Sequence, residues 1–191
     1  RLLRAAADAG YKTGIHTNQG HDIGGVQLAV RMGVRHINHL ELLTDSDAEL
    51  IKNSPGLYTV FLPTAEEFVF SDHIGQIHKC LDISERIVLS SDFNPGSSPV
   101  LSPFFVMTSA VLRYRISDPE LLVNSYTRNP AEMLYLSDRG RLEPGKKADI
   151  VLLDLENTEQ IPYFGSFGIV SHTIKNGAVY GFENRPFGVE R

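Results

Sequence analysis

Residues 86–96 read RIVLSSDFNPG: an apolar run over 86–91 leads into Asp92, and Asn-Pro-Gly follows as a turn. A short apolar run closed by turn residues is typical of a strand that is buried on both faces in a parallel sheet. Three earlier runs repeat this pattern, and a helix-like stretch follows each of them, so that strands recur every ~25 residues. These strand candidates lie at 13–16, 34–40 and 57–62. The sequence therefore predicts parallel βα units over its first two thirds.

Helix signals fill the intervals between these runs. Gly24 and Gly25 open an apolar stretch that Gly33 stops, and Thr44 is an N-cap residue type shortly before 48–53. Further helices are expected at 1–9, from 71 or 72 to about 81, and at 104–114, 119–126 and 131–136. A closed (β/α)8 barrel needs eight strands and ~200 residues or more. Four strands therefore predict an α/β fold that amounts to about half of such a barrel.

The pattern of predicted elements changes after Gly140. Short β-type runs at 147–154 and 168–180 replace the βα pattern, and Asn176-Gly177 lies between alternating residues as a hairpin signal. We expect two units, a partial hydrolase-type barrel at 1–138 and a small C-terminal β-module at 139–191.

Composition narrows the range of partners. The 191 residues hold 18 Lys and Arg against 23 Asp and Glu, a net charge of −5, which argues against nucleic acid or an anionic membrane surface. The single cysteine, Cys80, excludes an internal disulfide and is expected to be an inert packing residue. No apolar run approaches the ~20 residues that span a bilayer. Because the chain begins at Arg1 with no basic-then-apolar leader, we expect a cytoplasmic protein, either processed or a piece of a longer chain.

Three strand candidates end in groups that can bind a metal or transfer a proton. His16 ends the first, His39 the second and Asp92 the fourth. Chemistry collects at strand ends in parallel βα folds, and imidazole with carboxylate suits zinc or iron. Each residue alone could be structural, a hydrogen-bonded histidine or a turn-forming aspartate. Their coincidence at successive strand ends favours a site. The remaining histidines lack such placement and are expected on the surface or in loops: His21, His73, His78 and His172, with His36 a polar surface candidate.

Several blocks in order carry a resemblance to a known family. The sequence resembles the amidohydrolase superfamily, and within it the imidazolonepropionase family. The blocks are GIHTNQ at 14–19, NHLE at 38–41, VFLPT at 60–64, SSDFNPGSS at 90–98, TRNPAEMLYL at 127–136, RLEPGKKADIVLLD at 141–154 and IPYFGSFGIVSHTIKNG at 161–177.

The resemblance implies a role for each matching residue. His16 and Asp92 would be ligands of one metal ion, zinc or iron, and Asp92 would also transfer the proton during catalysis. His39 would stand beside the metal as a catalytic residue. Gln19 would contact the substrate ring. The loop after Asp92 would line the substrate through Asn94, Gly96 and Ser97.

The resemblance also implies a reaction and a larger molecule. The reaction is metal-dependent hydrolysis of the cyclic amide 4-imidazolone-5-propanoate to N-formimino-L-glutamate, a step of histidine degradation. Two of the family's ligands, a His-x-His pair on the first barrel strand, have no counterpart here. We therefore expect the C-terminal half of a (β/α)8 barrel plus part of a composite β-sandwich, inactive alone, with a possible homodimer of the full-length protein and a small-molecule substrate.

Two alternatives stay open at this point: another cyclic-amide hydrolase or deaminase of the superfamily, and a non-catalytic half-barrel that serves binding or assembly. A half-barrel also predicts unpaired strand edges near 13–16 and 87–91, where the missing strands would pair.

Overall fold

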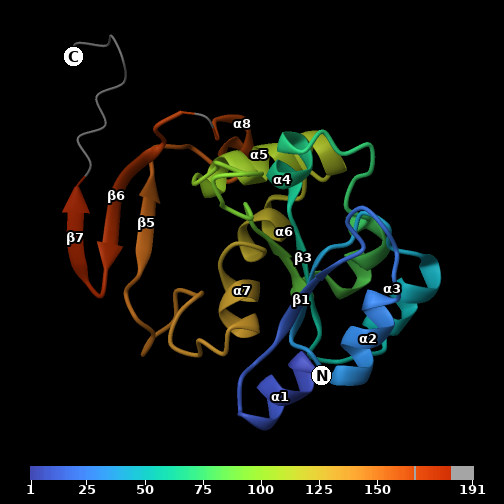
Figure 1. The fold of residues 1–191 in the computed structure, drawn as a ribbon. Coiled ribbons are helices and arrows are strands. Elements are labelled where there is room, and N and C mark those ends of the chain that lie inside the picture. The colour runs from blue at the N-terminus through green and yellow to red at the C-terminus, as the bar shows by residue number, and fades with distance from the viewer. Residues whose placement is uncertain (166, 182–191) are drawn as a thin grey trace.

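A computed structural model describes residues 1–165 and 167–181 of the chain, and its core is a parallel four-stranded sheet (Figure 1). The strands are β1 (Gly14–Thr17), β2 (His36–His39), β3 (Tyr58–Phe61) and β4 (Ile87–Leu89), in the order β1-β2-β3-β4. All residues of β3 and β4 are buried, as expected for apolar strands covered on both faces. The predicted α/β fold with a parallel sheet is confirmed.

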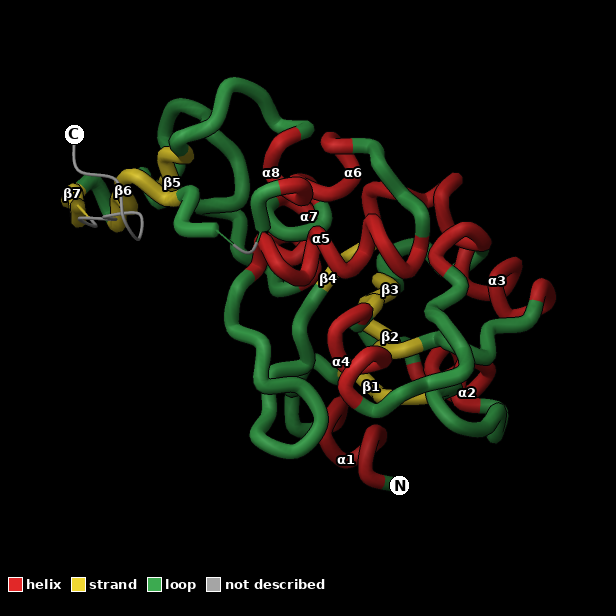
Figure 2. The backbone as a smooth tube through the Cα atoms, turned by 90° about the horizontal axis from the view of Figure 1, so that it is seen from above, coloured by secondary structure: helices red, strands yellow, loops and turns green. Residues whose placement is uncertain are grey.

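Figure 2 shows the four strands following one another in a row, with helices around them. The row does not close on itself: among the described strands, β1 and β4 each have one paired neighbour in this sheet. The two unpaired edges therefore lie where the sequence predicts them. No described helix is long and apolar enough to cross a membrane.

Helices connect and cover the strands. Apolar residues of the sheet pack against them in a main core that includes Val26, Ile37, Ile51, Phe61 and Tyr114, and a second, smaller cluster holds the remaining buried side chains of β3 and β4. The α-helices of this part are α1 (Leu2–Asp8), α2 (Gly25–Met32), α3 (Asp45–Lys52), α4 (Pro63–Phe68), α5 (Pro103–Tyr114), α6 (Pro119–Asn124) and α7 (Arg128–Met133).

Local chemistry explains where α2 and α3 begin and end. Thr44 is the N-cap of α3: its hydroxyl accepts from the Asp47 N–H at 3.1 Å and donates to the Asp47 carboxylate at 2.8 Å. Gly33 ends α2 with a left-handed φ of 61°, which glycine adopts without steric cost. The sequence signals at Thr44 and Gly33 therefore act as predicted.

One predicted helix, from 71 or 72 to about 81, is wrong. The chain instead begins α4 at Pro63 and later forms a 3₁₀ segment, η1 (Ile77–Arg86). Proline suits the first helical turn because its missing N–H has no partner there. Ser71 caps no helix: its hydroxyl accepts from the His73 N–H and donates to the His73 carbonyl, which closes a turn.

The C-terminal part forms a separate antiparallel sheet of three strands. A short helix, α8 (Gln160–Tyr163), lies between the first and second of these strands in the chain. The strands are β5 (Ile150–Leu153), β6 (Val170–Lys175) and β7 (Ala178–Gly181), in the order β5-β6-β7. The predicted hairpin at Asn176-Gly177 connects β6 to β7, and both residues have positive φ. Residues 182–191 of the predicted β-module lie outside the described residues. The boundary at 138 and the composite sandwich stay predictions.

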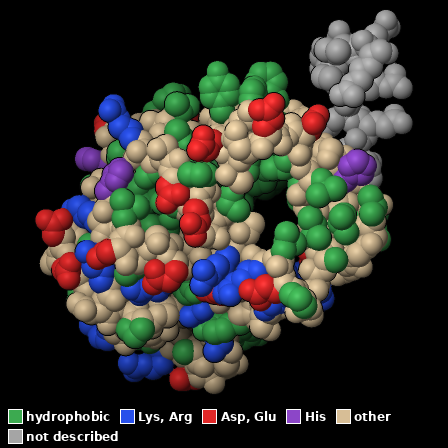
Figure 3. Space-filling model, turned by 180° about the vertical axis from the view of Figure 1, so that it is seen from behind, with side chains coloured by type: hydrophobic (Ala, Val, Ile, Leu, Met, Phe, Trp, Pro, Cys, Tyr) green, Lys and Arg blue, Asp and Glu red, His purple; other side chains and the backbone are tan. Residues whose placement is uncertain are grey.

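Hydrophobic side chains lie on the surface of this second sheet (Figure 3). Val151, Leu152, Val179 and Tyr180 are each about half exposed or more. A sheet of three short strands with exposed apolar side chains buries little surface of its own.

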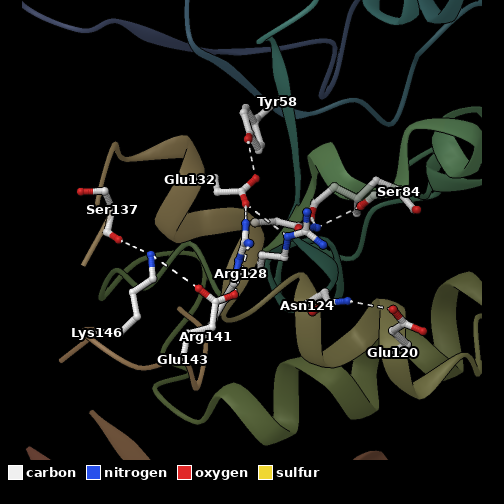
Figure 4. Close-up of polar contacts among 12 residues, drawn as sticks. Tyr58, Ser84, Glu120, Asn124, Arg128, Glu132, Ser137, Arg141, Glu143 and Lys146 are labelled. Atoms are coloured by element: carbon white, nitrogen blue, oxygen red, sulfur yellow. Dashed lines mark hydrogen bonds and ion pairs between the residues drawn. The ribbon is translucent and has the colours of Figure 1, made fainter. Parts of the chain in front are cut away.

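A polar cluster fastens α7 to the segment that leads into β5 (Figure 4). Glu132 of α7 accepts from Arg128 Nε at 3.2 Å, from Arg141 and from the Tyr58 hydroxyl at 3.4 Å. Farther along, the Lys146 ammonium donates to the Ser137 carbonyl at 2.6 Å. These contacts hold the connection to the second sheet against α7 and the residues that follow it.

Candidate active site

The first two strands bring His16 and His39 into contact. Thr17 is paired with His39 across β1 and β2, so the two histidines leave the sheet at the same carboxyl end. His16 Nδ1 lies 2.9 Å from His39 Nε2, and the ring centroids are 5.0 Å apart. His39 is buried and His16 is exposed on the edge strand. The two strand-end histidines therefore lie side by side, as the sequence predicts.

The backbone is strained at these strand ends. Asn18, His39, Leu40 and Asp92 are non-glycine residues with φ between 53° and 82°. Such conformations cost ~1–3 kcal/mol each and persist where the surrounding structure holds them. Two hydrogen bonds hold Asn18 in its strained conformation. Its carbonyl accepts from the Leu42 N–H at 2.8 Å, and its side-chain amide donates to the Leu42 carbonyl at 3.1 Å.

Asp92 follows β4 at the same end of the sheet, on a loop with its own brace. The carbonyl of Ser91 accepts from the Thr64 hydroxyl at 3.2 Å and from the Ser98 hydroxyl at 2.5 Å, and both hydroxyl residues are fully buried. This double acceptance fixes the peptide that leads into Asp92. Thr64 belongs to α4, so the helix that sequence reasoning missed helps to place a predicted site residue.

The charge of Asp92 acts on the pKa of His16. Partial burial of the His16 ring and the neighbouring His39 lower the pKa of His16, while the charge of Asp92 acts in the opposite direction and raises it. A lowered pKa favours the neutral imidazole, which is the form that binds metals. His16 therefore contacts His39 and lies within the electrostatic range of Asp92.

The predicted substrate-lining residues lie near this end, but their side chains are engaged to different degrees. The Asn94 amide donates to the Asp92 carbonyl and the Ser97 hydroxyl, both at 2.8 Å, and its oxygen accepts from the backbone N–H of Gly96 and Ser97. All of its polar capacity therefore shapes the loop. Gln19 is half-buried in the loop after β1.

Sequence reasoning missed Glu41, the last residue of the NHLE block. Its carboxylate is completely buried, with Oε1 3.5 Å from His39 Nδ1. Neither of its oxygens has a hydrogen-bond partner among the described atoms. The signal in the sequence is an acidic residue two positions after His39, between Leu40 and Leu42.

A second buried carboxylate, Glu66 of α4, lies deeper in the helix layer. It accepts from the Tyr114 hydroxyl at 2.5 Å, the Gly75 N–H at 2.9 Å and Arg113 Nε at 3.1 Å. Burial raises the pKa of Glu66 to about 7, and the charge of Glu41 adds to that increase. The two carboxylates are therefore close enough to repel each other.

A cavity of about 480 Å³ lies at the opposite, amino end of the strands. Lys12, Arg35, Gly56 and Tyr135 are among its lining residues. The Arg35 guanidinium donates to the carbonyls of Gly56, Glu132 and Met133 and is therefore held in place by the backbone. This cavity contains none of the predicted site residues.

The donor set fits part of a metal site. His16 and Asp92 supply imidazole nitrogen and carboxylate oxygen, which suit zinc or iron, and the lowered pKa of His16 favours the binding form. Zinc in proteins is usually four-coordinate. Within residues 1–165 and 167–181, no group of three or more His, Cys, Asp or Glu side chains is arranged to hold a metal ion. A site that used His16 and Asp92 would therefore need further ligands from outside the described residues.

Comparisons with known proteins show the family of the chain. Residues 3–179 match the model of the amidohydrolase family. The chain is 32% identical over 177 residues to the imidazolonepropionase of Alkaliphilus metalliredigens, which covers 93% of this chain and 42% of that protein. It is 35% identical over 184 residues to the imidazolonepropionase of Kosmotoga olearia, covering 96% of this chain and 45% of that protein.

A solved structure shares the fold. An adenosine deaminase from Xanthomonas campestris with bound zinc superposes with a TM-score of 0.74 at 19% identity, covering 94% of this chain and 47% of that one. The chain belongs to the amidohydrolase family. It resembles imidazolonepropionases and spans less than half the length of the curated relatives that it matches.

Proposed function

We propose that this chain is the C-terminal half of an imidazolonepropionase, which hydrolyses 4-imidazolone-5-propanoate to N-formimino-L-glutamate. The observation that carries the proposal is the contact between His16 and His39 at the carboxyl end of a parallel sheet, the end at which Asp92 follows β4. The identity to imidazolonepropionases over more than nine tenths of the chain supports the substrate.

Asp92 is the proton-transfer group in this proposal. A water oxygen forms a bond to the ring carbonyl carbon while one of its protons passes to the Asp92 carboxylate. The ring carbon–nitrogen bond then breaks as Asp92 returns that proton to the leaving nitrogen, so that atoms and charge balance. The brace at the Ser91 carbonyl holds Asp92 in place for both steps.

His39 and Gln19 would act on the substrate directly. His39 stabilises the charge that develops on the carbonyl oxygen during attack. Gln19 both donates and accepts hydrogen bonds, which suits a ring that carries both kinds of group. Gly96 and Ser97 would line the substrate from the loop that Asn94 shapes.

His16 and Asp92 would hold the metal together with ligands from outside this chain. When bound, such an ion lowers the pKa of a coordinated water from 15.7 to about 7 and so makes it a nucleophile at neutral pH. Because two ligands are too few for zinc, we expect the isolated chain to bind metal weakly and to be inactive.

The test is Asp92→Asn in the intact gene product. We expect kcat to fall by about 10²–10⁴-fold while binding of imidazolonepropionate is retained, because the amide keeps the shape but cannot accept the proton. Asp72→Asn, at an exposed position, is the matched control. Unchanged turnover in Asp92→Asn would remove the proton-transfer role. Turnover of guanine or cytosine instead of imidazolonepropionate would favour a deaminase of the same superfamily.

A further inference from the structure

The cavity at the amino end of the strands is lined by two cations. Lys12 comes shortly before β1 and Arg35 directly before β2, so both lie at the end of the sheet opposite His16 and His39. Figure 1 shows α1 and α2 on this side of the sheet, whereas α4 lies on the other side. Among the described lining residues none is acidic, and no described carboxylate forms an ion pair with Lys12 or Arg35. The positive charge of this cavity is therefore not neutralised by the described part of the chain.

The Arg35 side chain is held in place and still has free donors. Its guanidinium donates from Nε to the Met133 carbonyl at 3.0 Å, from Nη1 to the Gly56 carbonyl at 2.8 Å and from Nη2 to the Glu132 carbonyl at 2.7 Å. Its Cζ also lies 4.6 Å from the centroid of the Tyr58 ring. A guanidinium has five N–H donors, so one on Nη1 and one on Nη2 have no partner among the described atoms. A guanidinium fixed in this way is suited to bind the oxygens of a carboxylate or a phosphate.

The ring of Tyr135 brings the two cations together. Arg35 Cζ lies 4.3 Å from the ring centroid, and Lys12 Nζ lies 5.0 Å from the same centroid. The end of α7 positions this ring, because Tyr135 has a left-handed φ of 59° and the Leu136 N–H donates to the Ala131 carbonyl at 2.8 Å. An aromatic face attracts each cation, but two positive charges beside one ring repel each other. An anion bound to both cations would offset that repulsion.

The walls of the cavity indicate the rest of the ligand. The volume of about 480 Å³ lies within the ~300–1,000 Å³ that is typical of small-molecule sites. Apolar side chains from α2, the start of β2 and the turn before β3 contribute much of the lining: Ala29, Val30, Met32, Val34, Pro55 and Leu57. Such walls favour a carbon framework, while the cations favour an acidic group.

We propose that this cavity binds a small organic anion, with its carboxylate or phosphate group held by Lys12 and Arg35 and its apolar part against the walls. Carboxylate and phosphate share the oxygen atoms that arginine recognises, and the probes below distinguish them. The cavity is separate from the candidate active site, so the proposal does not rest on the proposed function.

The first measurement is calorimetric titration of the intact gene product with benzoate and, separately, with inorganic phosphate. A constant ionic strength of about 0.1 M chloride keeps the screening of charges the same in every titration. Benzamide has the shape of benzoate without its charge and is the control. We expect saturable one-to-one binding of at least one of the two anions and none of benzamide. Binding of benzoate alone would assign a carboxylate ligand, and binding of phosphate alone a phosphate ligand. Absence of saturable binding for both anions, or equal binding of benzamide, would overturn the proposal.

Three variants test the two cations. Lys12→Met removes a charge at an exposed position, and we expect the Kd to rise by about 3- to 5-fold. Arg35→Met removes the planar donor group and should raise the Kd by about 10- to 100-fold. Arg31→Met removes an exposed charge of α2 that does not line the cavity, and its Kd should equal that of the parent. If Arg35→Met does not fold, the comparison of Lys12→Met with Arg31→Met decides alone. Equal affinity in those two variants would overturn the proposal.

Methyl-labelled methionine locates the bound anion. Met32 lines the cavity, whereas Met107 belongs to α5 and is not among the lining residues. We expect the anion to shift the Met32 methyl signal with the same Kd as in calorimetry and to leave the Met107 signal in place. Met32→Leu assigns the signal by removing it. Binding by calorimetry without a shift of the Met32 signal would place the anion elsewhere and overturn the proposal.

Discussion

The buried carboxyl of Glu66 makes the stability of the fold depend on pH in a predictable direction. Burial raises its pKa from the ordinary 4.5 to about 7. In the window between these values the folded chain keeps a proton that the unfolded chain has lost. The free energy of unfolding contributed by this group is therefore fully present below pH 4.5 and is lost as the pH rises through about 7.

The magnitude follows from the size of the shift. Each unit of pKa corresponds to ~1.4 kcal/mol, so the shift of Glu66 amounts to about 3 kcal/mol. Glu66→Gln removes the titration and keeps the shape of the side chain. Relative to the parent chain, the free energy of unfolding of the variant should therefore rise by about 3 kcal/mol between about pH 4 and about pH 8. The ion pair with Arg113 forms only when Glu66 is ionised, and its effect is already included in the pKa of about 7.

The assay is urea unfolding followed by far-ultraviolet circular dichroism at several pH values. Subtracting the parent curve from the variant curve cancels the other titrating groups, because both chains share them. Glu67→Gln removes a carboxylate from the next, half-buried position and controls for the loss of one charge. We expect its curve to run parallel to that of the parent. A difference between Glu66→Gln and the parent that does not vary with pH would refute the reasoning.

Three further substitutions test the packing around the site, each by chemical denaturation. Gly14→Ala should destabilise by about 1–3 kcal/mol, because its Cβ would lie 2.1 Å from the His36 ring; an unaffected stability would mean that His36 is free to move. Thr64→Val should cost about 1 kcal/mol through the lost hydrogen bond to the loop before Asp92, and Thr64→Ser should recover most of it. Arg86→Met should cost about 3 kcal/mol or more, because its guanidinium donates to four backbone carbonyls around the end of α3; a loss below about 1 kcal/mol would contradict that count.

The four parallel strands are predictable from the sequence because each is a short apolar run that ends in turn residues. The same alternation predicts that strand ends meet, and His16 and His39 do so at 2.9 Å. Consecutive strands of a parallel sheet lie side by side and point the same way, so their carboxyl ends come together. This is why two residues 23 positions apart can be placed side by side without a structure.

The segment after β3 is less predictable, because tertiary contacts decide it. Ser71 is a good cap by residue type, yet it closes a turn with His73, while the Gly75 N–H is held by Glu66. The side chain of Glu66 therefore sets the path of residues that follow it by nine positions. Local patterns contain no information about such a partner.

The sequence also predicts some residues of the site and not others. Residue type and strand position indicate His16, His39 and Asp92. The position of Glu41 in the NHLE block gives no sign that its carboxylate is buried against His39, because burial depends on the packing of the whole sheet. Likewise, the family resemblance implies that Asn94 lines the substrate, and the structure shows that its amide is used within the loop.

The metal content of the intact gene product tests the central claim most directly. The account predicts about one zinc or iron ion per chain in the parent protein and in His21→Ala, whose side chain is exposed. It predicts a large loss of bound metal in His16→Ala and in Asp92→Ala. Undiminished metal content in both of these variants would contradict the claim that His16 and Asp92 share one ion.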